Sequence, residues 1–129
     1  MHILGIGTDI IEIHRIETMV KKWGNKFLSR VFCRDEILYA QSKGAFFHSS
    51  LAARFAAKEA VLKALGTGLS GARWPDIEIV SHHGCPQVVL RGSIGERAEK
   101  LLVKKIHLSL SHCGEYALAF AVAEGESGE

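Results

Sequence analysis

The sequence predicts a single α+β domain in which helices pack on a mainly antiparallel sheet. Three observations lead to this class. The 129 residues fit one average domain, helical periodicity dominates the first half, and strand-like segments follow one another as hairpins towards the end. The expected order is β-α-α-α-β-β-α-β-β. Because neither an internal repeat nor a linker is visible, we expect one domain over residues 1–123 and a polar tail over residues 124–129.

The chain begins with an apolar, β-branched segment over His2–Ile11, which predicts a strand. Gly5 and Gly7 weaken the middle of this strand, so they indicate a bulge or the close approach of another group. Apolar residues at helical spacing then predict a helix over Glu12–Trp23, and the helix breaks at Gly24-Asn25.

Further helical segments fill the chain up to residue 65. A short helical piece spans Phe27–Val31, and Asp35-Glu36 opens another helix, where acidic residues suit the helix dipole. The strongest helix is Leu51–Leu65, which is rich in Ala and Leu. Ser49-Ser50 offers its N-cap, and Gly66 fits the left-handed residue that commonly ends a helix.

The rest of the chain is dominated by two hairpins on either side of a helix. The expected elements are a loop over Thr67–Pro75, strands over Asp76–Ser81 and Gln87–Arg91 joined by a turn at His82–Pro86, a helix over Ser93–Lys105, a strand over Ile106–Ser111, a turn at Gly114-Glu115 and a final strand over Tyr116–Ala123.

The composition is that of an ordinary globular protein, with 47% hydrophobic and 23% charged residues, and it excludes a disordered or collagen-like chain. The longest apolar run, Tyr116–Ala123, is far shorter than the ~20 residues of a membrane-spanning helix. The first residues lack a secretory signal, so we expect a cytoplasmic protein without a membrane partner. A net charge of +2 is too balanced to favour nucleic acid. Three cysteines without a CxxC pair predict reduced thiols.

The long helix places charged side chains at the face that its apolar stripe should bury. Lys58 falls inside the stripe, Glu59 lies on its flank, and Lys63 lies one turn beyond Glu59. A charged side chain at a buried face must be paired with another charge or belong to a functional site. Two interpretations stay open. The first is a simple i,i+4 ion pair of Glu59 with Lys63, with the Lys58 stem running along the core; the second is a functional site.

Asp9 is the second feature that points to chemistry, because aspartate is unusual at the end of an apolar strand. It either caps the following helix, with Glu12 completing a capping box, or belongs to a site. Two carboxylates with a lysine nearby are what a magnesium–diphosphate site needs, since Mg²⁺ prefers one or two carboxylates, waters and phosphate oxygens. The GxG of the strand is not a dinucleotide-binding fingerprint, because its third glycine is missing.

His107-Leu108-Ser109 and Ser111-His112 add donors that suit a further phosphate. The alternative is that they form the polar outer face of a half-exposed strand. His112 has the phase of the apolar positions, so it should point inward or sit at the end of the strand.

Two motifs in this chain are long enough to compare with known families. The first is Gly5-Ile6-Gly7-Thr8-Asp9-Ile10, followed by Glu12 and Arg15-Ile16. The second is Arg54-Phe55-Ala56-Ala57-Lys58-Glu59-Ala60, then Lys63-Ala64 and Gly66-Thr67-Gly68. Both motifs resemble those of the holo-acyl-carrier-protein synthases. The separation of the motifs, the chain length and the closing His-x-Ser element are also similar, so the resemblance covers residues 3 to about 122.

The resemblance implies an enzyme that transfers the 4′-phosphopantetheine arm of coenzyme A to a serine of apo acyl carrier protein. The reaction requires Mg²⁺, releases adenosine 3′,5′-bisphosphate and supplies the holo carrier for fatty acid synthesis. By motif, Asp9 and Glu59 would bind the metal, and Lys63 would neutralise the diphosphate. Glu59, directly or through a metal-bound water, would take the serine proton, and Lys58 would support the coenzyme site. Candidate contacts with the coenzyme are Arg54, Gly66, Thr67, Gly68, Pro86, His107 and Ser109.

The resemblance also implies an assembly and a docking surface. The branch of the family with one fold per chain forms homotrimers with sites between subunits. The acidic carrier would dock on the basic segment from Arg15 to Arg34, with Arg15, Met19 and Lys26 as contacts. For Lys21 and Lys22 a solvated basic face is the favoured alternative, and Met19 is alternatively a core residue.

One departure from the family pattern is visible, and three alternatives stay open. The turn that usually reads Gly-Lys-Pro reads Gly84-Cys85-Pro86, which puts a phosphate contact from this turn in doubt. The alternatives are a transferase that also serves polyketide or peptide-synthetase carriers, a non-catalytic coenzyme A- or nucleotide-binding module, and a nucleic-acid-binding module. Asp9 and Glu59 count against the second, and the low net charge counts against the third.

Overall fold

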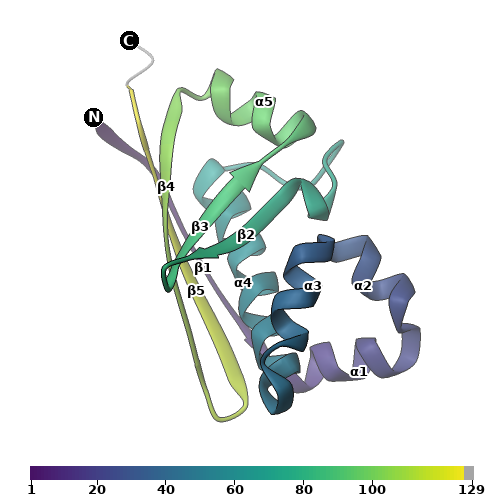
Figure 1. Ribbon diagram of the computed structural model, residues 1–129. Coiled ribbons are helices and arrows are strands. Elements are labelled where there is room, and N and C mark those ends of the chain that lie inside the picture. Colours follow the sequence, from purple (N-terminus) through teal and green to yellow (C-terminus); the bar gives the residue numbers. More distant parts are fainter. Residues whose placement is uncertain (127–129) are drawn as a thin grey trace.

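In a computed structural model, which describes residues 1–126, the helices lie on one face of a three-stranded antiparallel sheet (Figure 1). The sheet has the order β1-β5-β4, formed by β1 (His2–Glu12), β5 (Tyr116–Gly125) and β4 (Val103–Cys113). β2 (Ile77–His82) and β3 (Cys85–Leu90) form a separate antiparallel hairpin. The predicted α+β class and antiparallel pairing are confirmed. No helix within residues 1–126 is both long and apolar enough to cross a membrane.

The helices are α1 (Ile13–Trp23), α2 (Asn25–Val31), α3 (Arg34–Gln41), α4 (Phe47–Leu65) and α5 (Gly92–Lys100), with short 3-10 helices at Gly44–Phe46 and Trp74–Asp76. Four α-helices therefore precede β2, in agreement with the four helical segments expected there, although the expected order counts only three. Among the helices, the long α4 runs beside the sheet, α1, α2 and α3 lie together on its far side, and α5 lies apart from them (Figure 1). Gly24, with φ of 53°, separates α1 from α2, because few residues other than glycine adopt that conformation.

Several element ends differ from the expected ones. α4 begins at Phe47 without a side-chain cap, so Ser49-Ser50 lies inside its first turn. α5 ends at Lys100 because Leu102, with φ of 65°, turns the chain into β4. The Gly66 prediction is confirmed, since this residue ends α4 in the left-handed conformation.

The hairpin turn is tighter than expected, with positive φ at both His83 and Gly84. This is the geometry of the two-residue turns that match the strand twist, so β3 already begins at Cys85. At the C-terminal end, β5 continues to Gly125, two residues beyond the expected domain boundary. The rest of the expected tail, residues 127–129, lies outside the described residues.

Gly5 and Gly7 let β1 lie directly against the backbone of α4. A Cβ atom added to Gly5 would stand 1.8 Å from the Ala64 carbonyl oxygen, and one added to Gly7 would stand 1.9 Å from that of Ala60. The register also shifts between Ile3 and Gly5. The predicted alternatives are a bulge or a close approach; the close approach is confirmed at both glycines, and the approaching group is the helix.

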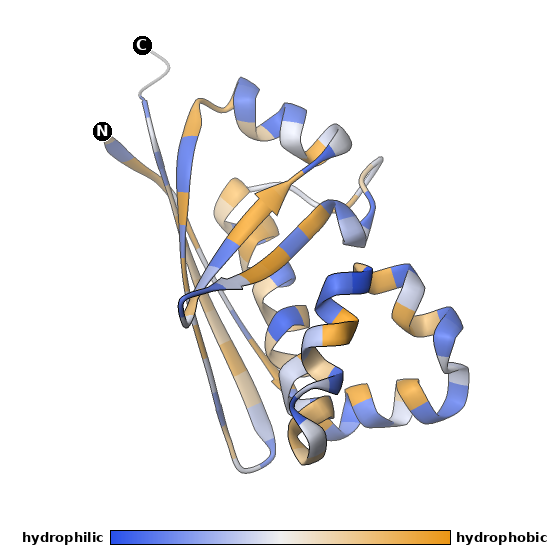
Figure 2. Ribbon diagram, in the orientation of Figure 1, coloured by the Kyte–Doolittle hydropathy of each residue, from blue (hydrophilic) through white to orange (hydrophobic). Residues whose placement is uncertain are grey.

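The core lies between α4 and the inner face of the sheet, where small side chains allow close packing. Figure 2 shows hydrophobic stretches on α4, β2 and β3, which meet on this side of the sheet. The outer face has no helix on it and carries exposed apolar side chains: Ile6 is 57% exposed, Ile10 63%, and Leu118 and Phe120 44% each. Buried alanines line the core: Ala56, Ala57, Ala60, Ala64, Ala117, Ala119, Ala121 and Ala123.

Candidate functional site

Asp9 and Lys63 meet where β1 runs along α4. The Lys63 Nζ donates to the Asp9 Oδ1 at 3.3 Å and to the Thr8 carbonyl oxygen at 2.9 Å. The Asp9 side chain is 21% exposed and that of Lys63 is 53% exposed, so the pair opens to solvent. Lys63 thus reaches across to the strand, and α1 has no side-chain cap, so the helix-cap interpretation of Asp9 does not hold.

Glu59 lies half-buried beside this pair. Burial raises its pKa, the charge of Asp9 raises it further, and Lys63 acts in the opposite direction. Two carboxylates that repel each other at the edge of solvent form a favourable place for a cation. No cluster of three or more His, Cys, Asp or Glu that would hold a metal occurs within residues 1–126. Two carboxylates alone fit Mg²⁺, which keeps several waters and takes phosphate oxygens as further ligands.

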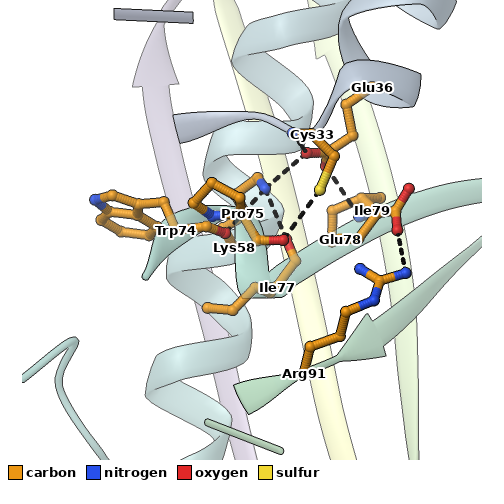
Figure 3. A network of polar contacts seen from close by, with 9 residues as sticks. All are labelled: Cys33, Glu36, Lys58, Trp74, Pro75, Ile77, Glu78, Ile79 and Arg91. Carbon is orange, nitrogen blue, oxygen red and sulfur yellow. Dashed lines mark hydrogen bonds and ion pairs between the residues drawn. The ribbon is translucent and has the colours of Figure 1, made fainter. Parts of the chain in front are cut away.

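Lys58 is placed differently from the sequence expectation. Its side chain is fully buried, and its Nζ donates to the Glu36 Oε1 at 2.8 Å, the Ile77 carbonyl oxygen at 2.6 Å and the Trp74 carbonyl oxygen at 3.2 Å (Figure 3). An ammonium group has three donors, so these acceptors use all of them. Because its three donors are taken up within the protein, Lys58 would support a coenzyme site by fixing α4 in the fold and not by contacting a phosphate.

Glu36 is the centre of this buried network (Figure 3). Its Oε1 also accepts from the Cys33 backbone at 2.8 Å, and its Oε2 accepts from the Ile79 backbone at 2.9 Å. The network therefore joins α3, α4 and the start of β2. Burial lowers the pKa of Lys58, and the charge of Glu36 opposes that shift. Sequence reasoning placed Glu36 only in the first turn of a helix, because its buried partners are distant in sequence.

A cavity of about 480 Å³ lies between α3, α4, the β2–β3 turn and β4. Three of the predicted coenzyme contacts, Arg54, Pro86 and Ser109, line it. Tyr39 and Lys43 also line it, and sequence reasoning missed both. Nothing in their local pattern separates them from an ordinary helix end.

Arg54 is a buried cation without a carboxylate partner among the described residues. It is 4% exposed, and burial lowers its pKa. Its Nη1 donates to the Ser50 Oγ at 3.5 Å and its Nη2 to the Ser81 Oγ at 3.3 Å, while its Nε has no partner. A buried charge of this kind is costly unless it is paired, so the cavity suits an anion.

The predicted site residues fall into two groups within one chain: Asp9, Glu59 and Lys63 form one, and the predicted coenzyme contacts Arg54, His107 and Ser109 lie apart from it. Arg54 and Glu59 are five residues apart on α4, which places them about 140° apart around the helix. In the sheet register, Ser109 lies opposite Phe120, and Phe120 lies opposite Thr8. Ser109 and His107 therefore belong to the outer face, whereas Asp9 has the phase of the inner face. The His107 ring contacts the Glu124 carboxylate at 3.4 Å.

The predicted Gly66-Thr67-Gly68 turn is held by Arg97 of α5, a residue that sequence reasoning missed. The Arg97 Nη1 donates to the Thr67 Oγ1 at 2.9 Å and to the Gly68 carbonyl oxygen at 3.0 Å, and its Nη2 donates to the Ser70 carbonyl oxygen. His112, expected inside or at the end of its strand, lies exposed near the end of β4, beside the ring of Phe46.

A second and larger cavity, of about 890 Å³, lies between α1, α2 and residues 69–74. Met19 and Lys26 of the predicted docking residues line it, together with two tryptophans, Trp23 and Trp74. Arg15 is exposed on α1 outside this lining. Met19 is 38% exposed and therefore not a core residue. Lys21 pairs with Glu17 at 2.9 Å on the surface, in agreement with a solvated face.

Comparisons with known proteins place this geometry among related chains. The family model described as the 4′-phosphopantetheinyl transferase superfamily matches residues 5–121. The chain is 51% identical to the holo-[acyl-carrier-protein] synthase of Chlamydia muridarum, over 93% of this chain and 94% of the relative. It is 47% identical to that of Clostridium tetani, over 96% and 98%. The structure of the Helicobacter pylori holo-[acyl-carrier-protein] synthase in complex with coenzyme A matches with a TM-score of 0.81 and 34% identity, over 92% of this chain and 99% of the other.

Proposed function

Because this chain belongs to the 4′-phosphopantetheinyl transferase superfamily, and within it to the holo-[acyl-carrier-protein] synthases, we propose that Asp9, Glu59 and Lys63 carry out the transfer step. As a member of this family, the enzyme converts apo acyl carrier protein to the holo form with coenzyme A. Adenosine 3′,5′-bisphosphate is the proposed second product. The observation that carries the site assignment is the cluster of two carboxylates and a lysine between β1 and α4.

Asp9 and Glu59 would hold a magnesium ion, which, when bound, supplies positive charge against the coenzyme diphosphate. Lys63 adds a solvent-exposed cation at the same place, since its Nζ is 3.3 Å from the Asp9 carboxylate. The carrier serine attacks the phosphorus that bears the pantetheine arm, the diphosphate bond to the adenosine half breaks, and adenosine 3′,5′-bisphosphate leaves. Glu59, directly or through a metal-bound water, is the proposed acceptor of the serine proton, because it is the carboxylate that lies beside both Asp9 and Lys63.

The residues that line the 480 Å³ cavity are proposed to bind the nucleotide end of the coenzyme. Arg54 is a buried cation without a carboxylate partner among the described residues, and Lys43 and Pro86 line the same space. A phosphate there would provide the missing counter-charge. The bound coenzyme of the Helicobacter pylori relative supports a coenzyme site in this fold.

We also propose that the enzyme is a homotrimer whose sites lie between subunits. Two observations support this assembly: the apolar outer face of the sheet is exposed, and His107 and Ser109 lie on that face, away from Asp9. A neighbouring copy that covers this face would bring the two groups together. Co-expression of Asp9→Asn with His107→Ala tests the idea: mixed trimers should regain activity that neither variant has, and a fully active monomer in light scattering would refute it.

The carrier is proposed to dock on the basic surface of α1 and α2, where Arg15, Met19 and Lys26 are exposed. An acidic helix suits this surface by charge, and Met19 offers an apolar contact at its centre.

The test of the whole proposal is the mass of the carrier. The protein is incubated with apo acyl carrier protein, coenzyme A and Mg²⁺, and the carrier is weighed by mass spectrometry. The proposal expects a gain equal to phosphopantetheine that EDTA abolishes. The absence of any gain with several carriers would overturn it in favour of a coenzyme-binding module.

A further inference from the structure

Two cations of the 480 Å³ cavity lie over one aromatic ring. The Arg54 guanidinium carbon is 3.9 Å from the centroid of the Tyr39 ring, and the Lys43 Nζ is 4.7 Å from it. Both distances fall within the ~6 Å over which the face of an aromatic ring attracts a cation. Tyr39 comes from α3, Lys43 follows the end of α3, and Arg54 comes from α4, so the ring joins two separate parts of the chain.

The Tyr39 ring supports an Arg54 guanidinium that is otherwise weakly held. Its two hydrogen bonds to Ser50 and Ser81 are long, at 3.5 and 3.3 Å, and its Nε is unpaired. Hydrogen bonding to Ser81 lowers the pKa of Tyr39, burial opposes this shift, and Lys43 and Arg54 lower the pKa further. The ring therefore adds to the two long hydrogen bonds and the surrounding packing in fixing the guanidinium.

We propose that Tyr39 is a positioning residue that holds Arg54 and Lys43 together as a two-cation receptor for a phosphate of the coenzyme. This inference rests on the proposed function. The diphosphate belongs with Asp9, Glu59 and Lys63, so the phosphate that remains is the 3′-phosphate. This group is a monoester with nearly two negative charges near neutral pH, and charge-assisted hydrogen bonds from two cations suit it. Tyr39 thereby determines the preference for coenzyme A over its 3′-dephospho form.

The experiment compares coenzyme A with 3′-dephospho-coenzyme A in steady-state kinetics and in calorimetric binding. Tyr39→Leu removes the ring and should raise the KM for coenzyme A roughly 3- to 30-fold, the range that a lost cation–π contact gives. The kcat and the KM for the dephospho form should stay within about twofold. Tyr39→Phe keeps the ring and should retain most of the preference. Leu38→Ala, at an exposed neighbouring position outside the cavity, is the matched control and should change neither KM.

Lys43→Met removes an exposed cation and provides a second test if Tyr39→Leu does not fold. It should weaken the binding of coenzyme A and leave the binding of the dephospho form unchanged. Equal losses for both coenzymes in Tyr39→Leu, or a fall in kcat alone, would overturn the inference. If Arg54→Gln abolishes the preference while Tyr39→Leu keeps it, the inference fails and the proposed function stands. A wild-type enzyme that leaves the carrier unmodified would instead overturn the proposed function.

Discussion

Replacement of Lys58 by methionine tests whether the buried network stabilises this fold. The change keeps the length and the apolar stem of the side chain, but it removes the charge that the Glu36 carboxylate contacts at 2.8 Å. It also leaves the carbonyl oxygens of Trp74 and Ile77 without this donor. Loss of one partner from a buried ion pair costs about 3–5 kcal/mol, because the other charge remains buried and unpaired. A domain of this size has only about 5–15 kcal/mol of stability, so the loss is large.

The assay is urea denaturation at pH 7 of the single variant and of the double variant Glu36→Gln/Lys58→Met. The double variant removes both charges of the Glu36–Lys58 pair and leaves neither one unpaired, so it should be more stable than Lys58→Met alone by about 1–2 kcal/mol. Lys63→Met removes an exposed lysine and should stay within about 1 kcal/mol of the wild type. A Lys58→Met protein within 1 kcal/mol of the wild type, or a double variant less stable than the single one, would refute the reasoning.

Three further changes follow from the structure. Gly7→Ala should lower the free energy of unfolding by about 3 kcal/mol or more in urea denaturation, because its Cβ would stand 1.9 Å from the Ala60 carbonyl oxygen. The control Gly68→Ala meets no atom within 4 Å and should change this free energy little. Burial raises the pKa of the Cys33 thiol to about 11. Iodoacetamide at pH 8 should therefore label the two exposed cysteines first and Cys33 only as the pH approaches 11. Equal labelling rates of the three cysteines by mass spectrometry would contradict this. Arg15→Glu should raise the KM for the carrier more than tenfold and leave the KM for coenzyme A unchanged, and an unchanged carrier KM would argue against docking on α1.

The elements that follow local rules were predictable from the sequence. Alternation in the strands, the Ala-rich pattern of α4 and Gly66 as its end are local signals, and the antiparallel class followed from consecutive hairpins. Local rules misplaced the start of α4 and the end of α5, because Phe47 begins its helix without a side-chain cap and the non-glycine Leu102 adopts a positive φ.

The candidate site was predictable only in part. Asp9, Glu59 and Lys63 were named from their phase and motif, and the structure brings them together. Lys58 and Glu36 could not be assigned, because the sequence does not show that residues 22 positions apart meet in the core. Tyr39 and Lys43 were missed for the same reason, since the cavity that they line forms only when α3 packs beside α4 and the hairpin.

The most direct test of the central claim is the rate at which Glu59→Gln modifies apo carrier at saturating Mg²⁺ and coenzyme A. Glutamine has nearly the shape of glutamate but offers neither a charge for the metal nor a base for the serine proton. A loss of at least about 10²-fold in kcat, with an unchanged fold, is the predicted result. Turnover close to that of the wild type would contradict both roles of Glu59 and the placement of the transfer step between β1 and α4.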